Sequence, residues 1–103
     1  MKKNYIASLL TVFMVSNAAA EIVQMTEVPT SWKLENYISD NVIAWYTSSS
    51  CTNGQVTFPA NASSDDKNRF WSVVTTGKVS GKEIFVRYDT VDCKINSFGF
   101  SQE

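Results

Sequence analysis

The sequence predicts a small, mainly β domain with one helix, cross-linked by one disulfide. Three observations lead to this fold class. Short runs of β-branched and aromatic residues are separated by turn-forming residues, one stretch between residues 63 and 77 has helical periodicity, and two cysteines follow an N-terminal export signal. The elements are short, as is typical of a small β domain.

The first twenty residues have the features of a secretory signal peptide. Lys2 and Lys3 precede an apolar run from Tyr5 to Val15, and Ala18-Ala19-Ala20 forms a small-residue cleavage site before Glu21. That run is too short to cross a membrane, which takes about 20 residues, and no later stretch approaches this length. We therefore expect a protein that is secreted or periplasmic after cleavage near Ala20-Glu21, with residues 21–103 as a single domain and no membrane span.

The charge balance argues against a nucleic-acid partner. Loss of residues 1–20 removes two of the nine Lys/Arg and none of the ten Asp/Glu, so the formal net charge changes from −1 to −3. Proteins that bind DNA or RNA cluster Lys and Arg to displace counterions from the phosphates. The basic residues here are scattered singly.

Cys51 and Cys93 are the two cysteines of the chain. In an oxidising compartment they predict one intramolecular disulfide. A loop of about 40 residues closed in this way stabilises a domain by roughly 3 to 4 kcal/mol in the chain-entropy model. The alternatives are a free thiol nucleophile and a metal pair, but zinc usually takes four ligands and the chain has no histidine and no third cysteine.

The first half of the mature chain predicts strands. Residues 22–38 form either one long, bent strand or two short ones, because Pro29 interrupts a β-rich stretch. Residues 42–47 are mostly β-branched or aromatic and predict a well-buried strand. Asn53-Gly54 favours the positive φ of a tight turn, and residues 55–58 alternate polar and apolar side chains up to Pro59.

One later stretch changes to the period of a helix. Ser63 or Ser64 can cap its start, acidic residues follow in the first turn, and Gly81 is suited to end it. The apolar positions recur at i, i+3, i+4 and i+7, namely Phe70, Val73, Val74 and Gly77. This face is expected to pack against the sheet.

Two strands follow the helix. In residues 83–89, alternation directs Ile84 inward and leaves Phe85 outside, beside Arg87. In residues 93–98, the same alternation places Phe98 on the face opposite Ile95. The order is thus β-β-β-α-β-β, which is the order of the OB-fold, a five-stranded barrel with a helix between its third and fourth strands. The alternative architecture is an open α+β sheet with the helix on one face.

The run from Cys51 to Ile95 resembles a group of short secreted proteins of Gram-negative bacteria. It contains C-T-N-G, V-T-F-P, R-F-W-S-V-V, S-G-K-E-I-F-V-R-Y-D and C-K-I. More remotely, the export signal, the single disulfide and the strand order resemble the B subunits of bacterial enterotoxins. That resemblance implies an OB-fold, pentameric rings and binding of cell-surface glycans. It rests on order and chemistry without a shared motif, so it assigns no site residue.

The sequence lacks the usual components of a catalytic centre. It has no histidine to act as a base, and no serine lies in a G-x-S-x-G turn. Paired acids such as Asp65-Asp66, or Asp89 with Asp92, are more simply explained as a helix start and as loop solvation than as a glycosidase pair. We therefore expect no enzyme activity, no cofactor and no metal.

Eleven aromatic residues remain after residue 20, more than a small barrel is expected to bury. Trp71 follows the core position Phe70 and is expected to point away from the apolar stripe. Three interpretations stay open: a protein or subunit interface, glycan contacts, and core residues whose face is assigned wrongly. The candidate ligand or interface residues are Trp32, Tyr37, Trp71, Phe85, Arg87 and Phe98.

These residues predict a secreted or periplasmic, non-catalytic binding module, with glycan recognition as its most concrete form. The alternative is a periplasmic protein that inhibits or assists a partner protein through an exposed aromatic patch. A homo-oligomer is left open in both cases.

Overall fold

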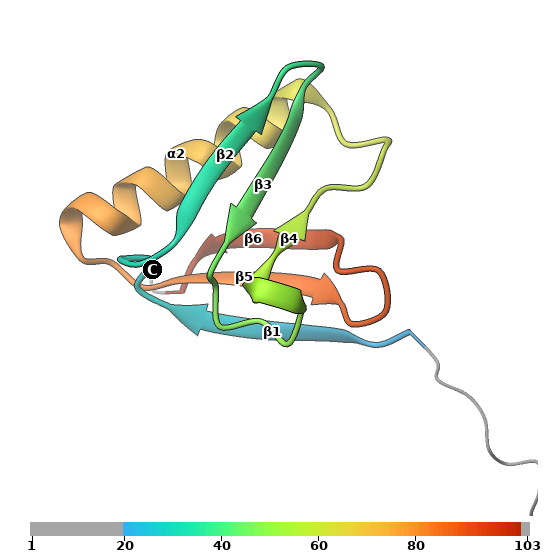
Figure 1. Ribbon diagram of the computed structural model, residues 1–103. Coiled ribbons are helices and arrows are strands. Elements are labelled where there is room, and N and C mark those ends of the chain that lie inside the picture. Colours follow the sequence, from blue (N-terminus) through green and yellow to red (C-terminus); the bar gives the residue numbers. More distant parts are fainter. Residues whose placement is uncertain (1–19, 102–103) are drawn as a thin grey trace, which may run out of the picture.

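The computed structural model describes residues 20–101 and is mainly β with one helix, as predicted (Figure 1). The predicted signal peptide lies outside the described residues except for Ala20. The elements are β1 (Ile22–Glu27), β2 (Lys33–Tyr37), β3 (Asn41–Trp45), the 3-10 turn η1 (Thr52–Gly54), β4 (Val56–Thr57), α2 (Ser64–Ser80), β5 (Ile84–Asp89) and β6 (Ile95–Phe100).

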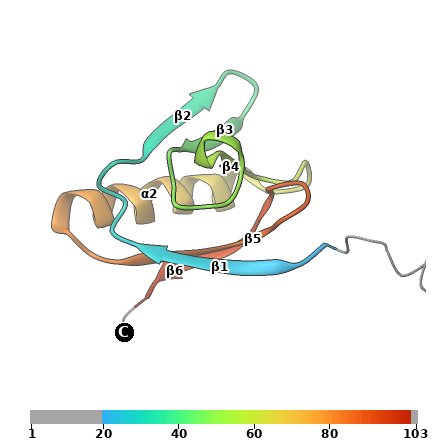
Figure 2. The same ribbon diagram turned by 60° about the horizontal axis from the view of Figure 1, so that its bottom comes forward.

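The strands form two antiparallel sheets of three strands each. Sheet 1 has the order β1-β5-β6 and sheet 2 the order β2-β3-β4. Figure 2 shows α2 running between the layer of sheet 1 and the β2–β3 hairpin. The two sheets are not closed into a barrel. Within residues 20–101, the backbone pairing between the two sheets consists of a single parallel bridge between Thr57 and Lys94.

The stretch before the first turn forms two short strands, one of the two forms expected. Pro29 is fully buried at the point where the chain leaves sheet 1 for sheet 2. The Thr30 amide donates to the Val28 carbonyl at 2.8 Å and the Trp32 amide to the Pro29 carbonyl at 3.3 Å. These local bonds replace ladder bonds that proline cannot donate, so the strand divides here.

The helix begins and ends where its sequence predicts. The Ser63 hydroxyl accepts from the Asp66 amide at 3.0 Å, and Gly81 ends the helix with φ 69°. A Cβ added at Gly77 would lie 3.0 Å from Ile84 Cγ2 and from Pro29 Cδ. The absence of a side chain at Gly77 therefore lets the helix approach β5 and the bend closely.

The core lies where the helix meets both sheets. Phe70 and Val74 of α2 are completely buried beside Val56 of β4 and Val86 of β5. The rings of Phe58, Phe70 and Phe98 pack edge to face, with Phe70 centroids 5.2 Å from each of the other two. Such edge-to-face pairs add to the hydrophobic gain from burial.

The alternation of β5 is as predicted. Ile84, Val86 and Tyr88 are buried, and Arg87 is exposed. Phe85 is half-buried on the same outer face as Arg87.

The predicted face of Phe98 is wrong, because β6 contains a β-bulge. Arg87 pairs with Ser97 but Tyr88 pairs with Ile95, so Asn96 has no partner in the register. The extra residue changes the face of every later side chain. Phe98 therefore points inward, on the same side as Ile95.

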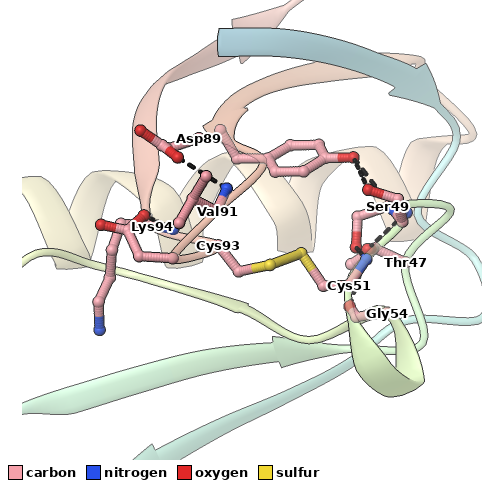
Figure 3. Close-up of a disulfide and its surroundings, with 11 residues drawn as sticks. Thr47, Ser49, Cys51, Gly54, Asp89, Val91, Cys93 and Lys94 are labelled. Carbon is pink, nitrogen blue, oxygen red and sulfur yellow. Dashed lines mark hydrogen bonds between the residues drawn. A yellow bond between two sulfur atoms is a disulfide. The ribbon is translucent and has the colours of Figure 1, made fainter. Parts of the chain in front are cut away.

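The Cys51–Cys93 disulfide is present, as predicted, with the two Cα atoms 6.3 Å apart. It connects the loop after β3 with the loop before β6 (Figure 3). The Thr57 amide donates to the Cys93 carbonyl at 3.2 Å, directly beside the Thr57–Lys94 bridge. The cross-link thus holds the two sheets together where β4 approaches β6.

We expect the double variant Cys51→Ala/Cys93→Ala to lose about 4 kcal/mol of unfolding free energy, because the unfolded chain regains the entropy of a loop that spans 42 residues. Urea unfolding of the oxidised protein and of the variant measures this difference. Wild-type protein treated with a reductant is the control and should match the variant. An unchanged urea midpoint would contradict the stabilising role.

Candidate functional site

The six candidate residues lie in four places rather than in one site. Phe85 and Arg87 lie together on the outer face of sheet 1, and Trp71 lines a cleft beside α2. Tyr37 lies at the exposed end of β2. The remaining two, Trp32 and Phe98, belong largely to the packed interior and are treated first.

Trp32 is 4% exposed and is a core residue. Its indole N–H donates to the Glu27 carboxylate, and its carbonyl accepts from Lys78 Nζ at 2.7 Å. The polar atom of the ring is therefore satisfied inside the fold. The burial of Trp32 therefore supports a role in the core. Its ring does not present a surface for a ligand.

Phe98 has a mixed position. Its ring packs against Phe70, but one part remains accessible and lines clefts between α2 and β6 together with Arg69 and Val73. The β-bulge places it there. Packing accounts for most of its surface, so it is a weaker candidate than the residues on the outer faces.

Phe85 and Arg87 are the centre of the best-organised surface group. The guanidinium carbon of Arg87 lies 5.0 Å from the centre of the Phe85 ring. Arg87 Nε donates to Gln24 Oε1 at 3.0 Å, and Nη1 donates to Ser97 Oγ at 3.4 Å. Side chains from all three strands of sheet 1 thus fix the guanidinium in one place.

The register of sheet 1 explains why these side chains meet. Gln24, Arg87 and Ser97 lie directly opposite one another across β1, β5 and β6. The next row along the sheet on the same face contains Thr26, Phe85 and Gly99. We call this surface the Arg87 face and define it by Gln24, Thr26, Phe85, Arg87, Ser97 and Gly99.

Gly99 supports the aromatic ring of the Arg87 face. A Cβ at Gly99 would lie 3.1 Å from Phe85 Cε2, so the ring lies over the space that a side chain would fill. An aromatic residue that covers a cross-strand glycine is held flat against the sheet. The Gly99 backbone and the Arg87 guanidinium, which lies over the ring 5.0 Å from its centre, therefore restrict the orientation of the Phe85 ring.

The charge of Arg87 is not neutralised within the described chain. The three ion pairs recorded in residues 20–101 use other cations, and Arg87 binds two neutral oxygens instead. A guanidinium has five N–H donors, so three remain for a ligand. This arrangement can bind hydroxyl, carbonyl or carboxylate oxygens with a donor that is already oriented.

Sheet 2 carries a second aromatic group that the sequence analysis missed. The Trp45 indole N–H donates to Glu35 Oε1 at 2.9 Å, and Lys33 Nζ lies 5.5 Å from the Trp45 ring centre. Tyr46 follows with φ 62° and is 56% exposed. Tyr37 shares the face of Lys33 and Glu35 by alternation. The strand is well buried, as expected, because Val42, Ile43 and Ala44 are all buried. Trp45 at its end is half-buried, and the exposed Tyr46 follows the strand.

Trp71 points away from the apolar stripe, as predicted, and is 38% exposed. It lines a cleft of about 380 Å³ between α2 and the β2–β3 hairpin. Lys67 closes one side, with Nζ 2.6 Å from the Asp40 carbonyl and 3.4 Å from Asp40 Oδ2. The Ser64 hydroxyl donates to the same carboxylate at 2.7 Å. We call this the Trp71 cleft and define it by Asn36, Asp40, Val42, Lys67, Asn68 and Trp71.

The hydrogen bond from Ser64 lowers the pKa of Asp40 below its usual 3.8. The Lys67 ammonium acts in the same direction, while partial loss of hydration opposes both. Asp40 is therefore ionised at neutral pH and holds the hairpin tip to the first turns of the helix.

No cluster of three or more His, Cys, Asp or Glu in residues 20–101 is arranged to hold a metal ion. Over the same residues, no helix is long and apolar enough to cross a membrane. Comparisons with protein-family models, curated proteins and solved structures find no match to this chain.

We expect Ser64→Ala to raise the pKa of Asp40 toward 3.8, because the largest cause of the lowering is removed. NMR titration of the Asp40 carboxyl carbon measures this shift. In the wild type, the folded pKa lies below the unfolded one, so the stabilising effect of Asp40 is present above pH 3.8 and is lost as the pH falls through the folded pKa. Identical titration curves for the two proteins would show that Ser64 does not act on Asp40.

Proposed function

We propose that the protein is a secreted or periplasmic, non-catalytic glycan-binding module whose binding surface is the Arg87 face. The observation that carries the proposal is the oriented pair of Phe85 and Arg87. Sugar rings have an apolar face of C–H groups and a rim of hydroxyls. A fixed aromatic ring with neighbouring hydrogen-bond donors and acceptors complements both properties.

The neighbours of the pair supply the polar groups that hydroxyls need. Gln24, Thr26 and Ser97 surround Phe85 and Arg87 and together offer amide and hydroxyl oxygens and N–H groups. Gln24 Nε2 donates to Thr26 Oγ1 at 3.1 Å, so these side chains are also ordered before a ligand arrives. Side chains that are held in place before binding lose less conformational entropy when a ligand binds.

The charge of the chain favours a small ligand over a long polyanion. Arg87 is a lone cation with neutral partners, while the mature sequence has a net negative charge. A sulfated polymer requires several clustered cations. One guanidinium suits hydroxyls or a single acidic group on a sugar.

The proposed fold for this module is a partly open, OB-like barrel. If β1 and β2 are the two halves of one bent strand, the six strands become five, with α2 between the third and the fourth. Each of the five strands then has two neighbours, counting the Thr57–Lys94 bridge between β4 and β6. This order supports the remote similarity to enterotoxin B subunits, which also bind glycans.

We expect Arg87→Gln to weaken glycan binding by about 10- to 100-fold, because a hydrogen bond from a charged group contributes about 1.5 to 3 kcal/mol. Arg87→Lys should recover only part of this loss, since lysine lacks the planar arrangement of donors. A glycan array identifies the ligand, and calorimetry with that ligand gives the affinities. Arg69→Gln is a matched control, because Arg69 is an exposed arginine on α2.

The proposal is wrong if the processed protein binds no glycan on the array. If Arg87→Gln and Phe85→Leu both bind the glycan with wild-type affinity, the Arg87 face is not the binding surface. Equal losses in Arg87→Gln and Arg69→Gln would indicate a general charge effect rather than a site.

The alternative function is binding of a partner protein, and the aromatic group on sheet 2 favours it. Tyrosine and tryptophan are enriched at the centres of protein interfaces, and Trp45 and Tyr46 are neighbours with ring centres 6.3 Å apart. The partner in the simplest case is a second copy of this chain. β2 and β6 are each paired with one strand of their sheet, and apart from the Thr57–Lys94 bridge beside β6 their other edges can accept another strand.

For a homo-oligomer formed through these edges, native mass spectrometry of the processed protein at micromolar concentration should show a defined species of several subunits. Tyr46→Ser should then reduce that species if the sheet 2 face takes part. A monomer at every concentration would contradict the oligomer and leave the glycan proposal standing.

A further inference from the structure

We infer that the Trp71 cleft is a second sugar-binding site, built to take one neutral hexose. The inference shares the ligand class of the proposed function but none of its residues. It depends on three features of the cleft: a half-exposed indole, two amide side chains to which residues 20–101 provide no hydrogen bond, and a carboxylate whose charge is already balanced.

The indole forms the apolar wall of the cleft. Trp71 directly follows the fully buried Phe70 in α2. The packing of Phe70 fixes this turn of the helix and therefore the direction in which the indole projects. The ring is half-exposed although a tryptophan ring is among the most favourable groups to bury. Val42 lines the same cleft from β3. An aromatic ring kept open beside a concave surface is suited to the C–H face of a pyranose.

Asn36 of β2 and Asn68 of α2 line the same cleft. Within residues 20–101, no hydrogen bond is recorded for either amide side chain, whereas many other polar side chains in this part of the molecule are paired. Each amide provides two donors and an acceptor. Two such groups that line one cleft with an indole can bind several hydroxyls of one sugar.

The charges in the cleft favour a neutral ligand. The Lys67 side chain is 11% exposed, and its ammonium is bound by the carbonyl and the carboxylate of Asp40. An acidic sugar would need that ammonium and would have to displace Asp40, while a basic ligand would compete with Lys67. The Asp40 side chain is half-exposed. Its second carboxylate oxygen can accept a hydrogen bond from an uncharged hydroxyl without disturbing the ion pair with Lys67.

The size of the cleft agrees with a single sugar. Its volume of about 380 Å³ lies near the lower end of the range for small-molecule sites, roughly 300 to 1,000 Å³. The cleft is open to solvent, so a hexose at the end of a longer glycan can enter with its neighbour outside.

The test uses NMR spectra of the processed, disulfide-bonded protein with methyl glycosides of glucose, galactose and their N-acetylamino derivatives as probes. We expect at least one probe to bind with millimolar affinity and to shift the indole N–H signal of Trp71 and the side-chain amide signals of Asn36 and Asn68. N-acetylneuraminic acid should shift these signals less than the best neutral probe. Trp45 provides an internal control, because its indole lies on the outer face of sheet 2.

Trp71→Leu should weaken binding of that probe by about tenfold or more, because it removes the flat ring but keeps apolar volume. Asn68→Ala, on the exposed side of α2, should weaken it several-fold and leaves the packing of the helix unchanged. Arg87→Gln should bind the probe like the wild type, which separates this site from the proposed function. Absence of any shift at Trp71, or unchanged binding by both cleft variants, would overturn the inference.

Discussion

The disulfide between Cys51 and Cys93 constrains the arrangement of the two sheets. It lies beside the bridge between Thr57 and Lys94, where sheet 2 and sheet 1 meet with few backbone hydrogen bonds. The Tyr88 hydroxyl, which accepts from the Ser50 amide at 3.0 Å, adds a contact close by. A domain of this size gains little stability from its core alone. The disulfide therefore keeps the two sheets, and with them their outer faces, in a fixed position relative to each other.

The helix provides the second connection and attaches the hairpin at both ends. Near its start, Lys67 binds the hairpin tip at Asp40. Near its end, Lys78 Nζ donates to the carbonyls of Trp32 and Thr30 at 2.7 and 3.2 Å, at the beginning of the same hairpin. Phe70 and Gly77 pack the helix into the core, so its position is fixed. The two lysines then hold β2 at a set distance from the surface of the helix. The Trp71 cleft is the space that remains between these two attachments.

Local chemistry predicted much of the fold. The caps at Ser63 and Gly81, the outer position of Phe85 beside Arg87, and the disulfide depend on neighbouring residues or on cysteine count. Two features depended on long-range structure. The β-bulge at Asn96 follows from the pairing with β5 and reverses the face of Phe98. The burial of Trp32 depends on Glu27 as acceptor and on the packed bend at Pro29. Neither has a signature in a single sequence, and the grouping of Gln24 and Ser97 around Arg87 likewise required the strand register.

Both candidate binding surfaces use residues that lie next to core positions in the chain. Phe85 lies between the buried Ile84 and Val86, and Trp71 follows the buried Phe70. In a strand the next residue points to the opposite face, and in a helix it is turned by about 100°. The same packing that stabilises the core therefore sets the direction of the exposed aromatic ring. A small domain without long loops can orient ligand-binding side chains in this way, because the rigidity of the core extends to its immediate neighbours.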